Sequence, residues 1–215
     1  MEKKPLIYIA VTNQGTIHHK LADTLIKYAK HPKYDVRFFF PNIVPLDASR
    51  NTCVENFIKI SNHEDDRLFF VDDDMDLPLN GLDVLIEHDK DIVAMCAIMV
   101  KPDDRGFLVP LPVACRYNSD KQYIVHQGGT GLTEVDAVGG ANIMIKRKVF
   151  ETIGTKAYEY DYYMNGTLSL VADYKFCQKA QDKGFKVYVD YDCVSHHYKE
   201  IDLLEFSRTM QAYAR

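Results

Sequence analysis

The stretch Phe69-Phe70-Val71-Asp72-Asp73-Asp74-Met75-Asp76 (residues 69–76) decides how the rest of the sequence is interpreted. It begins as a short apolar run, typical of a buried strand, and ends abruptly in three carboxylates. Ligands of α/β proteins bind just past the carboxyl ends of such strands. Adjacent carboxylates repel one another and are costly to desolvate, and a divalent cation such as Mg²⁺ or Mn²⁺ is their natural counter-charge. The stretch therefore indicates a metal site, with an acidic solvated turn as the alternative.

The spacing of these carboxylates separates their roles. Successive side chains of a strand point to opposite faces, so Asp72 and Asp74 share one side and Asp73 takes the other. We therefore expect the Asp-x-Asp pair to face one ligand while Asp73 is held elsewhere.

Composition limits the class of protein. The chain has 215 residues, a length that suits one domain, and its 47% hydrophobic and 27% charged content is ordinary for a globular protein. A net charge of −5 argues against a broad phosphate-binding surface. The longest apolar run, residues 92–100, is too short to span a bilayer, and the N-terminus predicts no signal peptide, so we expect a cytoplasmic protein. The cysteines lack any CxxC pairing and are predicted to be reduced and mostly buried.

Strands and helices are predicted to alternate through the first hundred residues. Apolar runs of strand length occupy residues 5–11, 34–40, 68–71 and 92–97, and helical patterns lie between them, at 17–29, through 54–58 and from 80. This alternation predicts a mostly parallel sheet with helices on both faces.

The second half changes character. Residues 101–131 predict irregular structure that serves a ligand, with short antiparallel strands near 113–115 and 122–125. Further strands are predicted at 134–138, 142–145 and 186–190, a helix at 169–183 that ends at Gly184, and an amphipathic helix at 201–214.

Four segments, taken in order, resemble the GT-A fold glycosyltransferases, specifically the family 2-like group with compact phage-type members. They are YIAVTNQG at residues 8–15; Ser49-Arg50-Asn51 with the aspartates of 69–76; VGGANIMIKRKVF at 138–150; and ADYKFC at 172–177 ahead of Gly184, Asp190 and His197. The likeness covers about residues 5–200.

The resemblance implies a fold and a division of the chain. We expect a GT-A-like three-layer α/β/α sandwich, with a mostly parallel central sheet and a small antiparallel acceptor-side sheet. Residues 1–215 would form one domain: a nucleotide-sugar-binding half at 1–100, an acceptor-side half at 101–200 and a C-terminal helix at 201–215.

The resemblance also implies a donor site. Asp72 would reach the donor's ribose or ring-side groups, Asp74 would bind Mn²⁺ or Mg²⁺, and both belong to the expected metal site. A late histidine would complete the metal's shell. His197 is our choice because Tyr198 follows it, and His196 competes because the register is uncertain by one residue. The expected donor is a nucleotide-sugar, with a UDP-sugar as the leading candidate.

Other residues are expected to contact the nucleotide-sugar. Thr12 and Gln14 end the first strand, where such folds hold the base. Arg50 and Asn51 are placed at the start of a helix, where a phosphate or a base edge is favoured. Capping and turn roles are the alternative for these four. Asp73 completes the donor set, together with a glycine pair that would let the backbone approach a sugar, or else form a β-bulge: Gly139 and Gly140.

Asp173 is the expected general base. An inverting transfer needs a carboxylate to take the proton of the attacking hydroxyl. Its place in the first turn of a helix also suits a carboxylate electrostatically, which is the alternative. Two departures from the family stand out: Ala172 replaces the usual Glu, and the chain has no tryptophan. Tyr160, Tyr162 and Tyr163 are candidates for the missing aromatic platform.

These expectations define a metal-dependent glycosyltransferase that moves a sugar from a nucleotide-diphosphate donor to an acceptor hydroxyl, with inversion. The alternatives are a nucleotidyltransferase or a metal-dependent phosphohydrolase on a similar fold, and a catalytically inactive nucleotide-sugar-binding module. The expected partners are the nucleotide-sugar and an unidentified hydroxyl acceptor. We expect the protein to bind nucleic acid only if nucleic acid is that acceptor. Oligomeric state is open.

Overall fold

A computed structural model of the chain describes residues 4–13, 15–103, 105–120, 122–200 and 202–213. Its centre is a nine-stranded sheet with the order β2-β1-β3-β11-β5-β14-β4, in which β6 pairs with β5 and β9 with β14. The strands are β1 (Leu6–Thr12), β2 (Asp35–Phe39), β3 (Arg67–Asp72), β4 (Met75–Asp76), β5 (Ile92–Pro102), β6 (Leu108–Pro112), β7 (Ala114–Tyr117), β8 (Tyr123–Val125), β9 (Leu132–Val135), β10 (Ala137–Val138), β11 (Asn142–Lys146), β12 (Asp161–Tyr162), β13 (Leu168–Leu170) and β14 (Val187–His197). The helices are α1 (His19–Tyr28), α2 (Leu46–Ile60), α3 (Gly81–Glu87), α4 (Arg147–Ile153), α5 (Ala172–Gln181) and α6 (Leu203–Tyr213).

The central sheet is mostly parallel. β1 runs parallel to β2 and β3, and β14 runs parallel to β5. β11 lies antiparallel between β3 and β5, so the strands on either side of it share one direction. The carboxyl ends of β1 and β3 therefore meet at one edge of the sheet, which is where the sequence places its aspartates.

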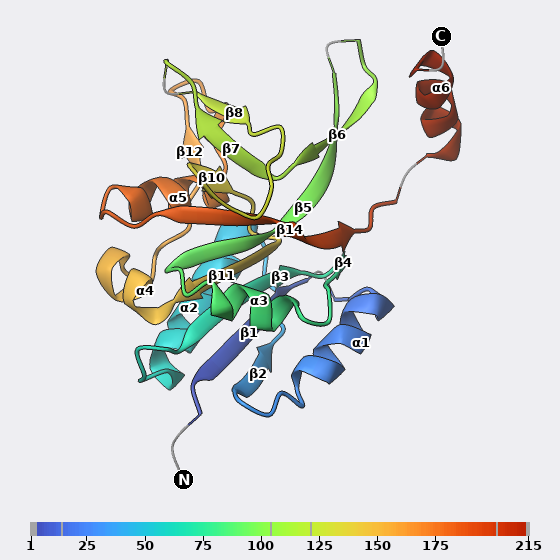
Figure 1. Cartoon of the computed structure of the whole chain (residues 1–215). Coiled ribbons are helices and arrows are strands. Elements are labelled where there is room, and N and C mark those ends of the chain that lie inside the picture. The colour runs from blue at the N-terminus through green and yellow to red at the C-terminus, as the bar shows by residue number, and fades with distance from the viewer. Residues whose placement is uncertain (1–3, 14, 104, 121, 201, 214–215) are drawn as a thin grey trace.

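Helices cover both faces of this sheet, giving a three-layer α/β/α sandwich (Figure 1). Alternate residues of a strand face opposite sides, and β3 follows this rule: Phe69 packs with α1 and α3, whereas Phe70 packs with α2, α4 and α5. Both faces of the inner strands are buried, which explains their continuous apolar runs.

Smaller antiparallel pieces surround the sandwich. β10, β7 and β8 form a three-stranded sheet, and β12 pairs with β13 in a hairpin just before α5. β5 and β6 continue as a ribbon beyond the central sheet, and α6 stands apart from the body of the chain (Figure 1). The predicted fold class, including the small antiparallel sheet, is confirmed.

Several local predictions were wrong. Pro45 is the N-cap of α2, so the helix begins at Leu46 and Arg50 lies in its second turn rather than at its start. Ser169 belongs to β13, so α5 begins later than predicted. β14 does not end near Asp190 but continues to His197 through an irregular register. The helix α4 was not predicted.

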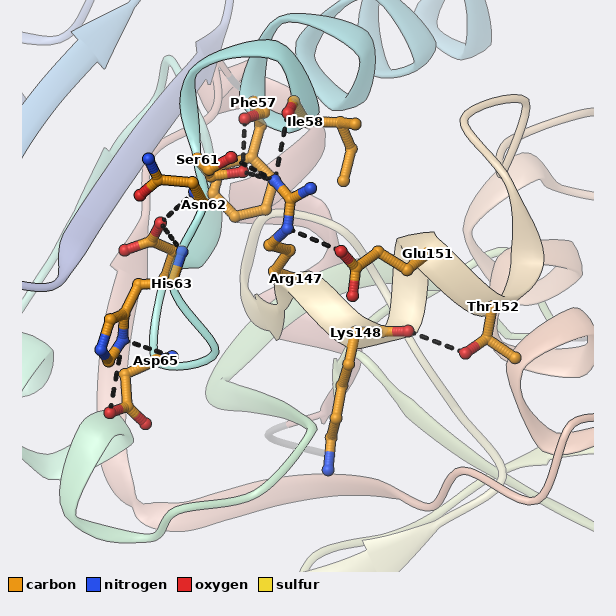
Figure 2. A network of polar contacts seen from close by, with 11 residues as sticks. Phe57, Ile58, Ser61, Asn62, His63, Asp65, Arg147, Lys148, Glu151 and Thr152 are labelled. Carbon is orange, nitrogen blue, oxygen red and sulfur yellow. Dashed lines mark hydrogen bonds and ion pairs between the residues drawn. The ribbon is translucent and has the colours of Figure 1, made fainter.

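Arg147, at the start of α4, fastens that helix to the end of α2 (Figure 2). One guanidinium nitrogen donates to the Ile58 carbonyl at 3.1 Å and also to the carbonyl and hydroxyl of Ser61, while Nε pairs with Glu151 at 2.8 Å. The last carbonyls of a helix have no partners inside it, and Arg147 satisfies that of Ile58. This arginine of the 138–150 segment therefore has a structural role.

The cysteines are free and buried, as predicted: Cys53, Cys96, Cys115, Cys177 and Cys193. Burial raises the pKa of the Cys53 and Cys177 thiols to about 12, so they stay protonated. Within the part of the chain that the structure describes, no helix has the length and apolar character to cross a membrane.

Candidate active site

Asp72 ends β3 beside the last residue of β1. The two strands are in register at this point, so Thr12 lies opposite Asp72, and its hydroxyl donates to the Asp72 carboxylate at 2.9 Å. The Asp72 backbone N–H donates to the Ala141 carbonyl at 2.9 Å, which fixes the turn against the start of β11. Thr12 thus orients Asp72 at the edge of the sheet where the sequence predicts the donor.

Asp74 meets the end of β14. The antiparallel pairing of β14 with β4 places His197 opposite Met75, and the backbone N–H of Tyr198 donates to the Asp74 carbonyl at 2.9 Å. The His197 Nε2 lies 3.1 Å from one oxygen of the Asp74 carboxylate, and the Lys199 ammonium pairs with the other oxygen. The Ile98 carbonyl, 3.1 Å from Nδ1 of His197, holds the ring in place.

His196 lies elsewhere. In the same pairing it stands opposite Asp76 and lines a separate cavity with Lys20, Asp23 and Val194. Successive side chains of a strand point to opposite faces of the sheet, so the two neighbouring histidines lie on opposite sides of β14. The structure thus brings His197, and not His196, to Asp74.

The two partners shift each other's ionisation. The hydrogen bond to Asp74 raises the pKa of His197 above its ordinary value of 6.5. Burial alone would raise the pKa of Asp74, but the hydrogen bonds from His197 and Lys199 outweigh it and leave that pKa below its ordinary value of 3.8. Both groups are therefore charged between the two values.

The Asp74–His197 pair predicts that the stability of the metal-free protein, measured with a chelator present, depends on pH. A raised histidine pKa contributes stability that is complete below 6.5 and is lost as pH rises through the raised value, whereas the Asp74 contribution is lost as pH falls below 3.8. The difference in melting temperature between the native protein and His197→Gln should be largest between these limits and shrink above them. His196→Gln serves as the control. A difference that is constant with pH would contradict the pairing.

The donor set suits a divalent cation in part. One oxygen of the Asp74 carboxylate and the Nε2 of His197 are both buried and lie 3.1 Å apart, so two atoms of metal-ligand type meet at one point, each with the other as its partner. Carboxylate oxygen and imidazole nitrogen suit Mn²⁺ or Mg²⁺ bound together with substrate phosphates. No cluster of three or more His, Cys, Asp or Glu that could hold a metal occurs among the described residues. These two residues fit a metal whose remaining ligands come from a substrate.

A cavity of about 430 Å³ opens at this edge of the sheet. Its wall is polar on the β3 side and apolar along the segment before α2. A second cavity of about 510 Å³ shares Asp73, Asp74 and Lys199 with the first and includes His18 and Tyr198. The first is lined by Thr12, Asn13, Thr16, Ile43, Val44, Leu46, Ser49, Asp72, Asp73, Asp74 and Lys199. Asp73, expected on the far side, thus lines both cavities.

Lys199 and the apolar segment 43–46 are lining residues that the sequence did not single out. Lys199 follows His197 by two residues, so on an extended chain both side chains face the same way, and this spacing was a usable signal. Segment 43–46 carries no comparable pattern.

Asp173 lies in the first turn of α5, as predicted. One of its oxygens accepts a hydrogen bond from the Gly140 backbone N–H at 3.0 Å, and the other pairs with the Arg50 guanidinium. Arg50 also lies 3.5 Å from the carboxylate of Asp72. The structure therefore joins three predicted site residues, Asp72, Arg50 and Asp173, in one ion-pair cluster.

Other predicted residues lie outside this cluster. The Asn51 side chain bonds both the backbone N–H and the carbonyl of Tyr158, at 2.9 and 2.7 Å, so it secures a loop. A Cβ on Gly139 would lie 2.3 Å from the Val113 side chain, a reason of packing for that glycine. Tyr162 and Tyr163 are exposed on the β12–β13 hairpin, while Tyr160 packs against the core. Gln14 lies outside the described residues.

Comparison with known proteins supports the fold. No family model and no curated protein sequence matches the chain. Among solved structures, A197 from STIV is similar with a TM-score of 0.59 at 16% identity, covering 91% of this chain and 86% of that one. GalNAc-T7, solved with UDP, GalNAc and Mn²⁺, is similar with a TM-score of 0.54 at 11% identity, covering 97% of this chain. This chain matches only 48% of the GalNAc-T7 chain.

The chain therefore has a GT-A-like fold, as these neighbours do. Identities this low define the fold alone. Membership of the family 2-like group stays a prediction.

Proposed function

We propose that this protein is a metal-dependent glycosyltransferase that transfers a sugar from a nucleoside-diphosphate sugar, with a UDP-sugar as the leading candidate, to an acceptor hydroxyl. The observation that carries the proposal is the pairing of Asp74 with His197 at 3.1 Å, beside a cavity that is lined by Asp74, Asp72 and Thr12. The GT-A-like fold of a chain solved with UDP and Mn²⁺ supports it.

The residues divide between donor and acceptor. Asp72, oriented by Thr12, would take the nucleoside side, and Ile43, Val44 and Leu46 offer an apolar wall to the base. Asp74 and His197 would hold Mn²⁺ or Mg²⁺, which stabilises the charge that develops on the leaving diphosphate. Lys199 lies on the same carboxylate and would add a second positive charge beside the phosphates.

Asp173 would be the base. Its carboxylate is oriented by Gly140 N–H and Arg50, which is suited to accepting a proton from an acceptor hydroxyl as that oxygen attacks the anomeric carbon. A base on the side opposite the leaving group gives inversion. Tyr162 and Tyr163, exposed on the hairpin that leads into α5, would lie on the acceptor side.

Thermal shifts with a panel of nucleotides and nucleotide-sugars test the donor site. We expect one nucleoside diphosphate to raise the melting temperature when Mn²⁺ is present and not without it, because Asp74 and His197 would hold the ion and its positive charge would attract the phosphates. At a hundredfold excess over the dissociation constant the gain is about 2.7 kcal/mol. Asp74→Ala should abolish the shift.

Asp76→Ala is the matched control, because this neighbouring carboxylate lines the separate cavity with His196. It should leave the shift intact. No shift with any nucleotide would refute the proposal. Release of inorganic phosphate from nucleotides would favour the phosphohydrolase, and release of pyrophosphate from nucleoside triphosphates the nucleotidyltransferase.

A further inference from the structure

Arg50 is a buried cation in the middle of the candidate site. Its side chain is 1% exposed and is among the largest fully buried side chains of the described residues. A buried guanidinium is strongly destabilising unless it is paired with carboxylates. With so little exposed surface, the guanidinium does not offer the phosphate or base contact that the sequence predicted.

Two carboxylates from different layers of the fold reach Arg50. Asp72 comes from the end of β3 and Asp173 from the first turn of α5. Unlike Arg50, both carboxylates are partly exposed, with side chains 30% and 19% accessible. The guanidinium therefore lies behind the pair, and the outer sides of the carboxylates remain free to meet ligands.

The walls around Arg50 are shaped to its flat side chain. Its Cζ lies 5.8 Å from the ring centroid of Phe70 and 5.5 Å from that of Tyr158, which is within the range of cation–π attraction. A Cβ on Gly140 would lie 2.3 Å from Cζ, so only glycine at this position leaves room for the guanidinium. The same glycine donates its N–H to Asp173.

We propose that Arg50 is a positioning residue that joins Asp72 on the donor side to Asp173 and holds the Asp173 carboxylate in its orientation, without itself touching the nucleotide. The inference rests on the proposed function. Without the guanidinium, the Asp173 carboxylate loses the partner of one of its two oxygens and is free to rotate about its remaining hydrogen bond from Gly140. A rotated Asp173 cannot accept the acceptor's proton, whereas Asp72 keeps its hydrogen bond from Thr12.

The test separates turnover from nucleotide binding. Arg50→Lys and Arg50→Met are compared with native protein for release of nucleoside diphosphate from the donor and for nucleotide affinity by calorimetry with Mn²⁺. We expect kcat to fall by about 10²-fold in Arg50→Met, because that is a typical contribution of a general base, with nucleotide affinity unchanged. The kcat of Arg50→Lys should lie between those of the native protein and Arg50→Met, because an ammonium group cannot bond both carboxylates as the planar guanidinium does. Nucleotide affinity that falls in step with kcat would overturn the proposal.

Arg67→Met is the matched control. Arg67 is also buried, on the same strand as Asp72 but at its other end, where it pairs with Asp89 at 3.1 Å. Its loss should lower the melting temperature and leave kcat unchanged. If it lowered kcat as much as Arg50→Met, the effect of Arg50 would be one of stability alone.

A double-mutant cycle tests the geometry independently of activity. Gly140→Ala should lower the melting temperature of the native protein, because its new methyl group overlaps the guanidinium. In an Arg50→Ala background the same substitution should cost little. Additive effects would overturn the placement of Arg50 against Gly140. A native protein that binds no nucleotide, together with a non-additive cycle, would refute the proposed function and leave the Arg50 packing standing.

Discussion

Asp173→Asn should abolish transfer while leaving the donor site intact. The amide keeps the shape of the carboxylate but cannot take a proton, and removal of a general base typically lowers kcat by about 10²–10⁴-fold. Nucleotide binding with Mn²⁺ should be unchanged, because Asp173 lies on α5, whereas the Asp74 and His197 pair lies at the β4–β14 junction. The measurement is donor turnover beside nucleotide affinity on the same preparation.

The control for this substitution is Asp182→Asn. Asp182 is the C-cap of the same helix, at the end far from Asp173. It should turn over donor at the native rate. An Asp173→Asn protein with native turnover would assign the carboxylate to the helix start, where a negative charge is favourable in its own right.

The sequence was a good guide where a periodic pattern met a chemical constraint. The apolar run before Asp72 indicated a buried strand, and the alternation of strands and helices predicted the layered sheet. The aspartates were placed correctly at the edge of that sheet, since the carboxyl ends of parallel strands meet there.

The sequence failed where packing decides. Charged residues are almost always exposed, so nothing in Ser49-Arg50-Asn51 predicted a buried arginine. Its burial depends on Asp173 and Gly140, which lie far away in the chain. Whether His196 or His197 meets Asp74 depends on the register of β14 against β4, and the irregular register of β14 after Asp190 hides it from any count of residues.

Phe70→Ala should be among the most destabilising single substitutions. The ring is fully buried on β3, packs edge-on against Tyr158 at 5.4 Å between centroids, and covers the guanidinium of Arg50. Truncating a buried phenylalanine to alanine typically costs about 3–5 kcal/mol, through lost burial and the cavity left behind. Urea unfolding with an unchanged m-value measures this loss. A loss below about 1 kcal/mol would mean that the site collapses around the missing ring.

Phe69→Ala separates the two consequences of that substitution. Phe69 is equally buried and adjacent in sequence, but it faces the opposite side of the sheet and packs with α1 and α3. Phe69→Ala should destabilise the fold to a similar extent, because a phenylalanine ring is again removed from a fully buried position. Of these two rings, Phe70 is the one that packs in the layer that contains Arg50. Turnover per folded molecule should therefore fall in Phe70→Ala and stay native in Phe69→Ala, since only the first loosens the guanidinium behind Asp72 and Asp173.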